Sequence, residues 1–350
     1  MNHNEHSADA IRTLDLLRLP LIAGVVLIHS NYLEALPEGC GNVSTAFSGF
    51  MDIWKYVLSL CVPAFFFISG YFFYRSGIPR PRELKAKFQR RFHTLMIPYL
   101  LWNLIGLLCL LIKTSPWLCS YFPQYSDVFN PWWRVLTNFY CLPDIGYPYD
   151  FVLWFIRNLM VIVLLTPLLN MLFKIMKLWS LIPICIVASL NCDLLGLQFT
   201  LWFFSLGGLV AIYSPDLKFI SRHRLLWLSL FIAMVAADRL KFIDLPAWIY
   251  ETVGIFTVVS LSEALAKRGV KWPPFLVRST FFVYAFHGLF TTVAQKSVLA
   301  VTAPFISGLT GAFATYLMIF LLLYGISLAT CTIMRAYFPY VTGLLTGNRS

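Results

Sequence analysis

Three ionisable residues lie within the first apolar stretch of the chain, residues 14–32, which reads LDLLRLPLIAGVVLIHSNY. Asp15 and Arg18 stand at its start, and His29 stands near its far end. On a helix, eleven residues at about 1.5 Å each place His29 roughly 16 Å beyond Arg18, which is about half of a hydrocarbon core of ~30 Å. Because ionisable groups in such a segment are costly unless they face protein or a wet cavity, we interpret all three as functional candidates.

His29 has the chemistry for group transfer. An imidazole can take a proton as a general base, or it can carry an acyl group as a nucleophile. Asp15 and Arg18 are three residues apart and can pair on one helix face, which leaves Arg18 able to contact a phosphate or thioester oxygen. The alternatives are a structural ion pair and a histidine bonded to a neighbouring helix carbonyl, and the residue types leave them open.

The composition is typical of a membrane protein. Of 350 residues, 59% are hydrophobic and 12% are charged, whereas roughly a quarter of the residues in a soluble protein are charged. The net charge of +11 does not predict nucleic-acid binding, because the basic residues segregate into alternate loops. The eight Cys show no metal-ligand or CxxC spacing, so we expect no metal, and a disulfide between Cys119 and Cys141 is one possibility.

Apolar runs of about 17 to 25 residues predict the elements that must position these groups. The polar residues 1–10 and the long first apolar run indicate no cleavable signal peptide and a cytoplasmic N-terminus, and the basic loops place both termini in the cytoplasm. We therefore expect an all-α, polytopic transmembrane helix bundle, a single domain over residues 1–350. Its ten expected spans are residues 14–33, 53–74, 94–112, 151–173, 179–195, 199–213, 225–239, 247–265, 279–298 and 307–334.

Two connections between the expected spans are distinctive. Residues 75–93, RSGIPRPRELKAKFQRRFH, predict a basic cytoplasmic loop. It either sets topology and contacts anionic lipid, or it binds a polyanion such as a nucleotide or coenzyme A. Residues 113–150, rich in Pro, Trp and Tyr, predict an aromatic extracytoplasmic loop with a short interfacial helix. Its aromatic rings either stack on sugars or form an interfacial belt.

Five stretches, in order along the chain, resemble the acyltransferase 3 family of integral membrane proteins. They are LDLLRLPLIAGVVLIHS (14–30), CVPAFFFISGYFFYR (61–75), RRFHTLMIPYLLWN (90–103), LWFIRNL (153–159) and FFVYAFHGLF (281–290). The resemblance implies transfer of an acyl group, commonly acetyl, from cytoplasmic acyl-CoA to a hydroxyl or amine of an extracytoplasmic or lipid-linked carbohydrate. It implies a multi-pass protein of a bacterial cytoplasmic membrane, with lipid, a carbohydrate acceptor and glycan-assembly proteins as partners.

The resemblance also implies a set of site residues. His29, Arg18 and Asp15 are the expected catalytic group. The donor, acyl-CoA or more narrowly acetyl-CoA, is expected to contact the basic residues Lys87, Arg90 and Arg91. The pore-lining candidates are Ser69, Trp154, Arg157, Tyr284 and His287.

A second class of function is compatible with the same residues. A transporter or flippase for an anionic or glycan substrate would also use a basic rim and membrane-embedded Arg and His. The sequence shows no inverted repeat, which favours the enzyme.

Overall fold

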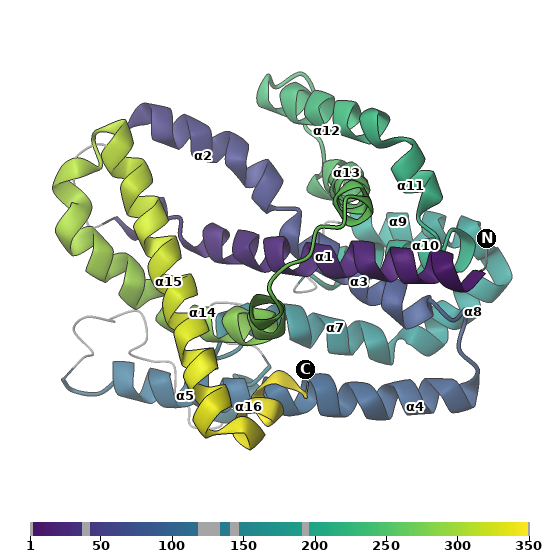
Figure 1. The fold of residues 1–350 in the computed structure, drawn as a ribbon, viewed down its shortest axis with the longest axis horizontal. Helices are drawn as coiled ribbons and strands as arrows, with labels where there is room; N and C mark the ends of the chain where they lie inside the picture. The colour runs from purple at the N-terminus through teal and green to yellow at the C-terminus, as the bar shows by residue number, and fades with distance from the viewer. Residues whose placement is uncertain (1–2, 37–42, 118–133, 141–146, 191–195, 349–350) are drawn as a thin grey trace. The chain divides into compact units, whose positions relative to one another are not determined.

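The computed structural model describes residues 3–36, 43–117, 134–140, 147–190 and 196–348. Every regular element in these ranges is helical, which confirms the expected all-α class. In chain order (Figure 1) they are α1 (His3–His29), η1 (Leu33–Ala35), α2 (Thr45–Leu58), α3 (Cys61–Tyr74), α4 (Pro81–Arg91), η2 (Phe92–Met96), α5 (Ile97–Lys113), α6 (Arg134–Thr137), η5 (Phe151–Leu153), α7 (Trp154–Leu164), α8 (Thr166–Met176), η6 (Lys177–Ser180), α9 (Leu181–Ser189), α10 (Leu197–Tyr213), α11 (Lys218–Arg222), α12 (Arg224–Arg239), α13 (Ala247–Lys267), α14 (Pro274–Thr302), η7 (Ala303–Phe305), α15 (Leu309–Tyr337) and α16 (Pro339–Thr346).

The chain divides into two compact units, each assembled from three segments distant in sequence. Unit 1 comprises Met1–Ile28, Ser48–Lys85 and Ile162–Val277. Unit 2 comprises His29–Phe47, Ala86–Val161 and Arg278–Ser350. His29, the last residue of α1, therefore belongs to unit 2, whereas Asp15 and Arg18 belong to unit 1.

In unit 1, α3 and α10 pack with their backbones in close approach. A Cβ at Gly70 of α3 would stand 1.9 Å from the carbonyl oxygen of Phe204. A Cβ at Gly207 of α10 would stand 2.0 Å from the carbonyl oxygen of Phe67. Neither position has room for a side chain, so the two glycines set the spacing of this helix pair, as small residues do between membrane helices.

Side-chain hydrogen bonds hold the first part of α1 within unit 1. Pro20 has no N–H and leaves the carbonyl of Leu16 without its helical partner. The indole Nε1–H of Trp272 donates to that carbonyl at 2.9 Å. The hydroxyl of Ser262 on α13 donates to the carbonyl of Thr13 at 2.7 Å. A proline inside the helix is thus accommodated by a tertiary donor.

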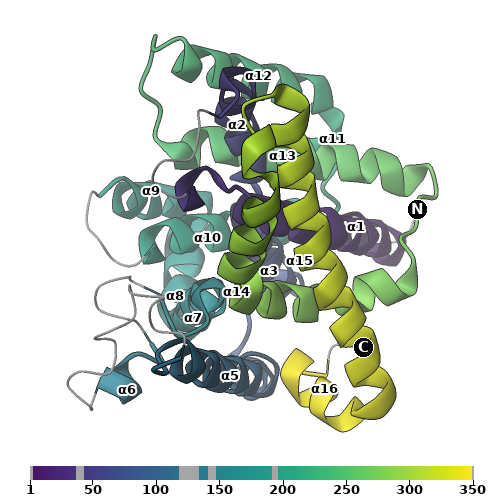
Figure 2. The same cartoon turned by 90° about the vertical axis from the view of Figure 1, so that its left-hand side faces the viewer.

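In unit 2, α16 closes against the start of α5. The indole Nε1–H of Trp102 donates to the carbonyl of Leu345 at 2.9 Å. Gly347 ends α16 with a positive φ of 65°, and a Cβ there would stand 2.7 Å from the carbonyl oxygen of Thr94. Both the backbone conformation and the space require glycine. In the same unit, α14 and α15 run side by side (Figure 2).

Five helical segments are long and apolar enough to cross a membrane. They are Thr45–Tyr74, Pro81–Lys113, Thr166–Ser189, Ala247–Lys267 and Leu309–Tyr337. Phe151–Leu164 and Leu197–Tyr213 are apolar but shorter. This agrees with an integral membrane protein, while the number of ten spans and the side of the termini stay predictions.

Two expected spans are interrupted in the structure, and a proline lies close to each interruption. The span at 53–74 is interrupted between Leu58 and Cys61, just before Pro63. The span at 151–173 is interrupted at Leu165, and α8 begins with Pro167 in its first turn. Pro167 cannot bond to the carbonyl of Val163, which instead accepts the hydroxyl of Thr166 at 2.6 Å.

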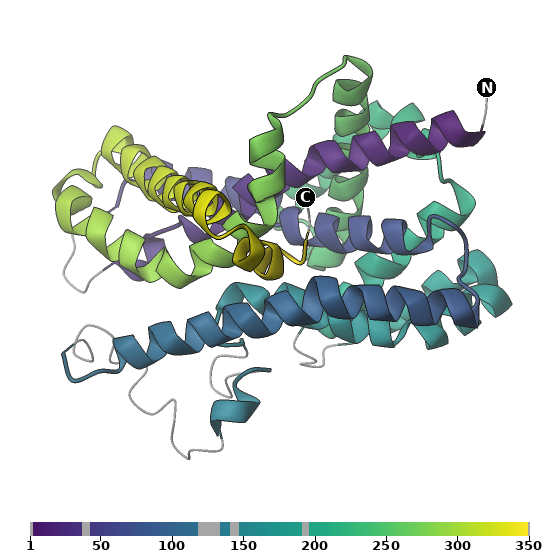
Figure 3. The same ribbon diagram turned by 60° about the horizontal axis from the view of Figure 1, so that its bottom comes forward.

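The basic stretch at 75–93 is mostly helical rather than an irregular loop. α4, η2 and α5 follow one another as one helical segment, Pro81–Lys113 (Figure 3). The wider π-helical turn at Phe92–Met96 precedes Pro98, which cannot donate a backbone hydrogen bond. The aromatic stretch at 113–150 contains the short helix α6 within its described part.

Candidate active site

His29 lies at the point where α1 ends, and it is partly exposed. Its ring packs edge-on against Phe151 at a centroid distance of 4.9 Å. The ring of His287 lies 5.4 Å away, tilted by 39°. The side-chain amide of Gln295 donates to the carbonyls of His29 at 3.0 Å and of Asn31 at 2.9 Å. These bonds satisfy backbone acceptors that a helix C-terminus leaves free, and they fix the backbone at His29.

His287 is fully buried on α14, and its hydrogen bonding defines its tautomer. Its Nδ1 lies 3.0 Å from the carbonyl oxygen of Val283, one turn earlier. A carbonyl accepts only, so Nδ1 carries the proton and Nε2 of the neutral ring is an acceptor. Nε2 has no hydrogen-bond partner among the described residues. The structure therefore presents an unused acceptor beside His29.

The segment 150–152 packs along α14 next to the two histidines. The backbone N–H of Asp150 donates to Oδ1 of Asn103 at 3.4 Å. The carbonyl of Val152 accepts the hydroxyl of Tyr284. A Cβ at Gly288 would stand only 2.6 Å from Oδ1 of Asp150, so the absence of a side chain at Gly288 admits the carboxyl group. The backbone of this segment is anchored, and its carboxyl group faces α14.

The carboxyl group of Asp150 is 1% exposed, and neither oxygen makes a hydrogen bond of normal geometry within the described part of the chain. Burial raises the pKa of Asp150 well above its ordinary value, and the nearby Val152 N–H and the Lys113 ammonium oppose this rise. A positive charge created next to this carboxyl group would stabilise its ionised form.

Together these side chains can hold and move a proton. His29 is a partly exposed imidazole, His287 is a buried acceptor, and Asp150 is a buried acid. The sequence pointed to His29 and His287 but not to Asp150 or Gln295. The signal for Asp150 was an acidic residue directly before the apolar run that starts at Phe151.

Asp15 and Arg18 form the expected ion pair. The guanidinium Nη2 of Arg18 lies 3.0 Å from Oδ1 of Asp15, and their side chains are 44% and 45% exposed. The guanidinium also lies 5.4 Å from the ring centroid of Phe72. Asp15 and Arg18 belong to unit 1 and His29 belongs to unit 2, and eleven residues of α1 separate Arg18 from His29 along the chain.

The three expected donor contacts lie on α4. Lys87 and Arg90 are three residues apart, and Lys87 and Arg91 are four apart, so all three side chains share one helix face. Lys87 and Arg91 are partly buried, and Arg90 is exposed. Such a face suits a phosphate group.

The pore-lining candidates fall into both units. Ser69 lies on α3 in unit 1, next to the glycine that sets the α3–α10 approach. Trp154 begins α7 in unit 2. Arg157 is 2% exposed, donating from Nε to Asn158 at 3.0 Å and from Nη1 to the carbonyl of Tyr140 at 3.1 Å. Arg157 thus anchors the end of the segment that carries α6, and Tyr284 anchors Val152.

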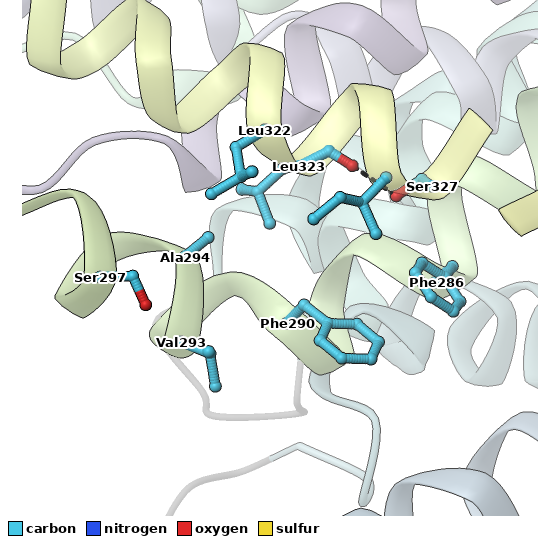
Figure 4. Close-up of a pocket in the computed structure, with 9 residues that line it drawn as sticks. Phe286, Phe290, Val293, Ala294, Ser297, Leu322, Leu323 and Ser327 are labelled. Atoms are coloured by element: carbon cyan, nitrogen blue, oxygen red, sulfur yellow. Dashed lines mark hydrogen bonds between the residues drawn. The ribbon is translucent and has the colours of Figure 1, made fainter. Parts of the chain in front are cut away.

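An apolar cavity of about 170 Å³ lies between α14 and α15 (Figure 4). The hydroxyl of Ser327 in its lining donates to the carbonyl of Leu323 at 2.6 Å, within its own helix. With no titratable group in its lining, the cavity suits hydrocarbon and is not a place for acyl transfer. The lining residues are Phe286, Phe290, Val293, Ala294, Ser297, Leu322, Leu323, Ile326 and Ser327.

Metal and disulfide chemistry find no support in the described ranges. No group of three or more His, Cys, Asp or Glu side chains there could hold a metal ion. Cys61, Cys109, Cys185 and Cys331 are free thiols. Cys119 and Cys141 lie outside the described residues, so their disulfide stays a prediction.

Comparison with known proteins agrees with this chemistry. The family described as "Acyltransferase domain" (acyltransferase 3) matches residues 11–336. A succinoglycan biosynthesis protein, ExoH, from Rhizobium meliloti (strain 1021) is 24% identical over 374 residues, which cover 98% of this chain and 94% of that protein. No solved structure matches the chain. Since the family match runs through nearly the whole chain, the protein belongs to the acyltransferase 3 family and is a transferase of acyl groups other than aminoacyl groups.

Proposed function

We propose that this enzyme moves an acyl group, acetyl in the simplest case, from cytoplasmic acyl-CoA to a hydroxyl or amine of an extracytoplasmic or lipid-linked carbohydrate. In this proposal it is a multi-pass protein of a bacterial cytoplasmic membrane, with about ten spans and both termini in the cytoplasm. The observation that carries the proposal is the partly exposed His29 with the buried His287 at 5.4 Å. A reachable imidazole backed by polar groups is the arrangement that general-base catalysis needs.

The reaction follows from the chemistry of a base beside a thioester. The acceptor hydroxyl gives its proton to the imidazole of His29 as its oxygen bonds to the thioester carbonyl carbon. The carbon–sulfur bond then breaks, and the departing coenzyme A thiolate takes the proton from the imidazolium. His29 as a nucleophilic acyl carrier is the other route by which the same side chain could act.

We assign binding of the acyl-CoA donor to the basic residues of α4. The shared face of Lys87, Arg90 and Arg91 suits the phosphates of coenzyme A. Arg18, held by Asp15, is a further contact for a phosphate or for the thioester oxygen. Ser69, Trp154 and Arg157 remain candidates for the lining of the substrate path.

The carbohydrate acceptor is proposed from the relatives. The relative from Rhizobium meliloti is named for succinoglycan biosynthesis, and succinoglycan is a polysaccharide. An acceptor built by a membrane-associated pathway would bring glycan-assembly proteins and lipid into contact with this enzyme.

Two measurements test the function. Purified protein in lipid nanodiscs should transfer label from radiolabelled acetyl-CoA to de-esterified surface polysaccharide, and intact protein that transfers none would contradict the proposal. Mass spectrometry of surface glycans from cells without the gene should show loss of an acyl ester with an unchanged amount of glycan. Loss of the glycan itself would instead indicate a transporter.

A further inference from the structure

We infer that His287 is the positioning residue of His29, accepting an N–H of its imidazole at Nε2, and that Asp150 supplies the buried negative charge behind the pair. The inference rests on the proposed function, because it assigns partners to the base of that reaction. It concerns only residues of unit 2.

The imidazole rings of His29 and His287 lie at a distance that suits a hydrogen bond between them. An N–H···N bond of about 3 Å between two imidazoles places their ring centroids a little over ~5 Å apart. The centroids of His29 and His287 are 5.4 Å apart with a tilt of 39°. This separation is compatible with such a bond, and catalytic hydrogen bonds often tighten only when substrate is bound.

The hydrogen bonding of His287 sets the direction of that bond. The Nδ1–H of His287 is committed to the carbonyl of Val283 at 3.0 Å. This leaves Nε2 as a fixed acceptor, and it has no other partner among the described residues. His29 must then donate, so one of its nitrogens keeps its proton and the other keeps its lone pair. That lone pair is what a base or a nucleophile needs.

His29 differs in exposure from His287 and Asp150. His29 is partly exposed, whereas His287 and Asp150 are 0% and 1% exposed. Of the three residues, His29 therefore has the most surface that a substrate could contact. This is the division of roles found when a base is oriented by a buried partner and stabilised by a buried acid.

The carboxyl group of Asp150 is the candidate for the buried negative charge. Residues 150–152 contact His29 through Phe151 and α14 through Gly288, the residue after His287. The carboxyl group of Asp150 has no hydrogen bond of normal geometry within the described ranges. Burial favours the protonated form of this carboxyl group, and the nearby Lys113 ammonium favours its ionised form. An imidazolium formed at His29 during transfer would add a second positive charge that favours the carboxylate.

Substitutions at position 287 separate positioning from packing. His287→Leu removes the acceptor, and we expect kcat to fall about 100-fold with the KM for acetyl-CoA and for de-esterified polysaccharide unchanged. His287→Gln can present its amide oxygen near the place of Nε2, and it should restore kcat to within about tenfold of wild type. Equal losses in both variants, or a normal kcat in His287→Leu, would overturn the inference.

Asp150→Asn removes the charge with little change in shape. We expect a fall in kcat of about 10- to 100-fold with both KM values unchanged. Glu251→Gln is the matched control, because Glu251 is a buried carboxyl on α13 whose Oε2 also lacks a described partner. The control should leave kcat unchanged. A normal kcat in Asp150→Asn, or an equal loss in Glu251→Gln, would remove Asp150 from the mechanism.

A spectroscopic measurement tests positioning without any turnover. Nitrogen-15 NMR of histidine-labelled protein in nanodiscs should show His29 as a single tautomer in wild type, identified by the signal that His29→Ala removes. The signal should become a mixture of tautomers in His287→Leu. A mixed population in wild type would refute the positioning role, even if the transfer proposal failed for another reason.

Discussion

Two groups of acidic and basic side chains, one in each unit, differ in exposure and in charge pairing. In unit 1, Asp15 and Arg18 pair at 3.0 Å, and both side chains are nearly half exposed. In unit 2, His287 and Asp150 are buried, and neither Nε2 of His287 nor the carboxyl oxygens of Asp150 have a hydrogen bond of normal geometry to described residues. The ring of His287 lies beside that of the partly exposed His29.

This difference distinguishes residues that stand out in the sequence from residues that we expect to affect acyl transfer. An exposed ion pair contributes about 0 to 1 kcal/mol, so its presence says little about what the protein does. A buried polar group without a partner is costly, and an active site is one of the places where such a group is retained. The comparison therefore predicts large effects on transfer in unit 2 and small effects at the Asp15–Arg18 pair.

The largest effect is expected at His29. His29→Ala, or the polar but non-basic His29→Asn, should lower the transfer rate about 100- to 10,000-fold, because a general base contributes that much. Folding, measured by thermal unfolding, and acyl-CoA binding should be nearly unchanged, since His29 is partly exposed and no described side-chain hydrogen bond depends on its ring. Near-normal transfer by well-inserted His29→Ala would refute the mechanism.

The next effect is expected at Gly288, which tests the place of Asp150. A Cβ there would stand 2.6 Å from Oδ1 of Asp150 and 2.9 Å from a methyl of Val152, so Gly288→Ala must displace both. We expect a loss of transfer of about 10- to 100-fold and a loss of stability of about 1 to 3 kcal/mol.

Gly325→Ala on α15 is the matched control, because nothing lies within 4 Å of its Cβ. It should be neutral or stabilise by up to ~1 kcal/mol, since alanine favours helix. Transfer rates and unfolding temperatures of Gly288→Ala and Gly325→Ala would show whether the position of Asp150 matters for transfer. Equal behaviour of the two would mean that Asp150 has room to move and that its position is not critical.

Part of the site was predictable because it depends on local spacing. Residues three apart on a helix face each other, so the Asp15–Arg18 pair follows from the sequence. His29 stood out because an ionisable group in an apolar run is unusual. The sequence also singled out His287, but it did not show that its ring lies beside that of His29 or that Gln295 binds the carbonyl of His29, because both residues are more than 250 positions away in the chain. Such proximity is a product of tertiary packing.

The fold was predictable in class but not in its interruptions. Long apolar runs predict membrane helices, and the described ranges are helical throughout their regular elements. Counting apolar residues ignores backbone chemistry, however. Pro63 and Pro167 lie close to interruptions of expected spans, whereas Pro20 lies inside α1, where Trp272 donates to the carbonyl that the proline leaves free. Sequence patterns do not reveal such a tertiary donor.

A smaller effect is expected at the basic face of α4. Replacing Lys87, Arg90 and Arg91 with Gln should raise the KM for acetyl-CoA about tenfold and change kcat little, because these residues bind phosphates remote from the reacting carbon. Replacing Arg80, Arg82 and Lys85 with Gln removes the same charge from the start of the same segment and should change KM less. Equal shifts would leave general electrostatics and lipid contact as the function of the stretch.

The smallest effect is expected at the exposed ion pair of α1. Asp15→Asn breaks the pair, and it should lower the free energy of unfolding by less than about 1 kcal/mol, because water solvates both side chains. Arg18→Gln should be equally mild for stability, so a change in its kinetics can be attributed to the substrate. If Arg18 contacts the donor, the KM for acetyl-CoA should rise a few-fold in Arg18→Gln and less in Asp15→Asn, where the guanidinium is retained. A loss of transfer as large as that of His29→Ala would contradict the comparison of the two units, because it would show that a half-exposed ion pair matters as much as the buried groups of unit 2.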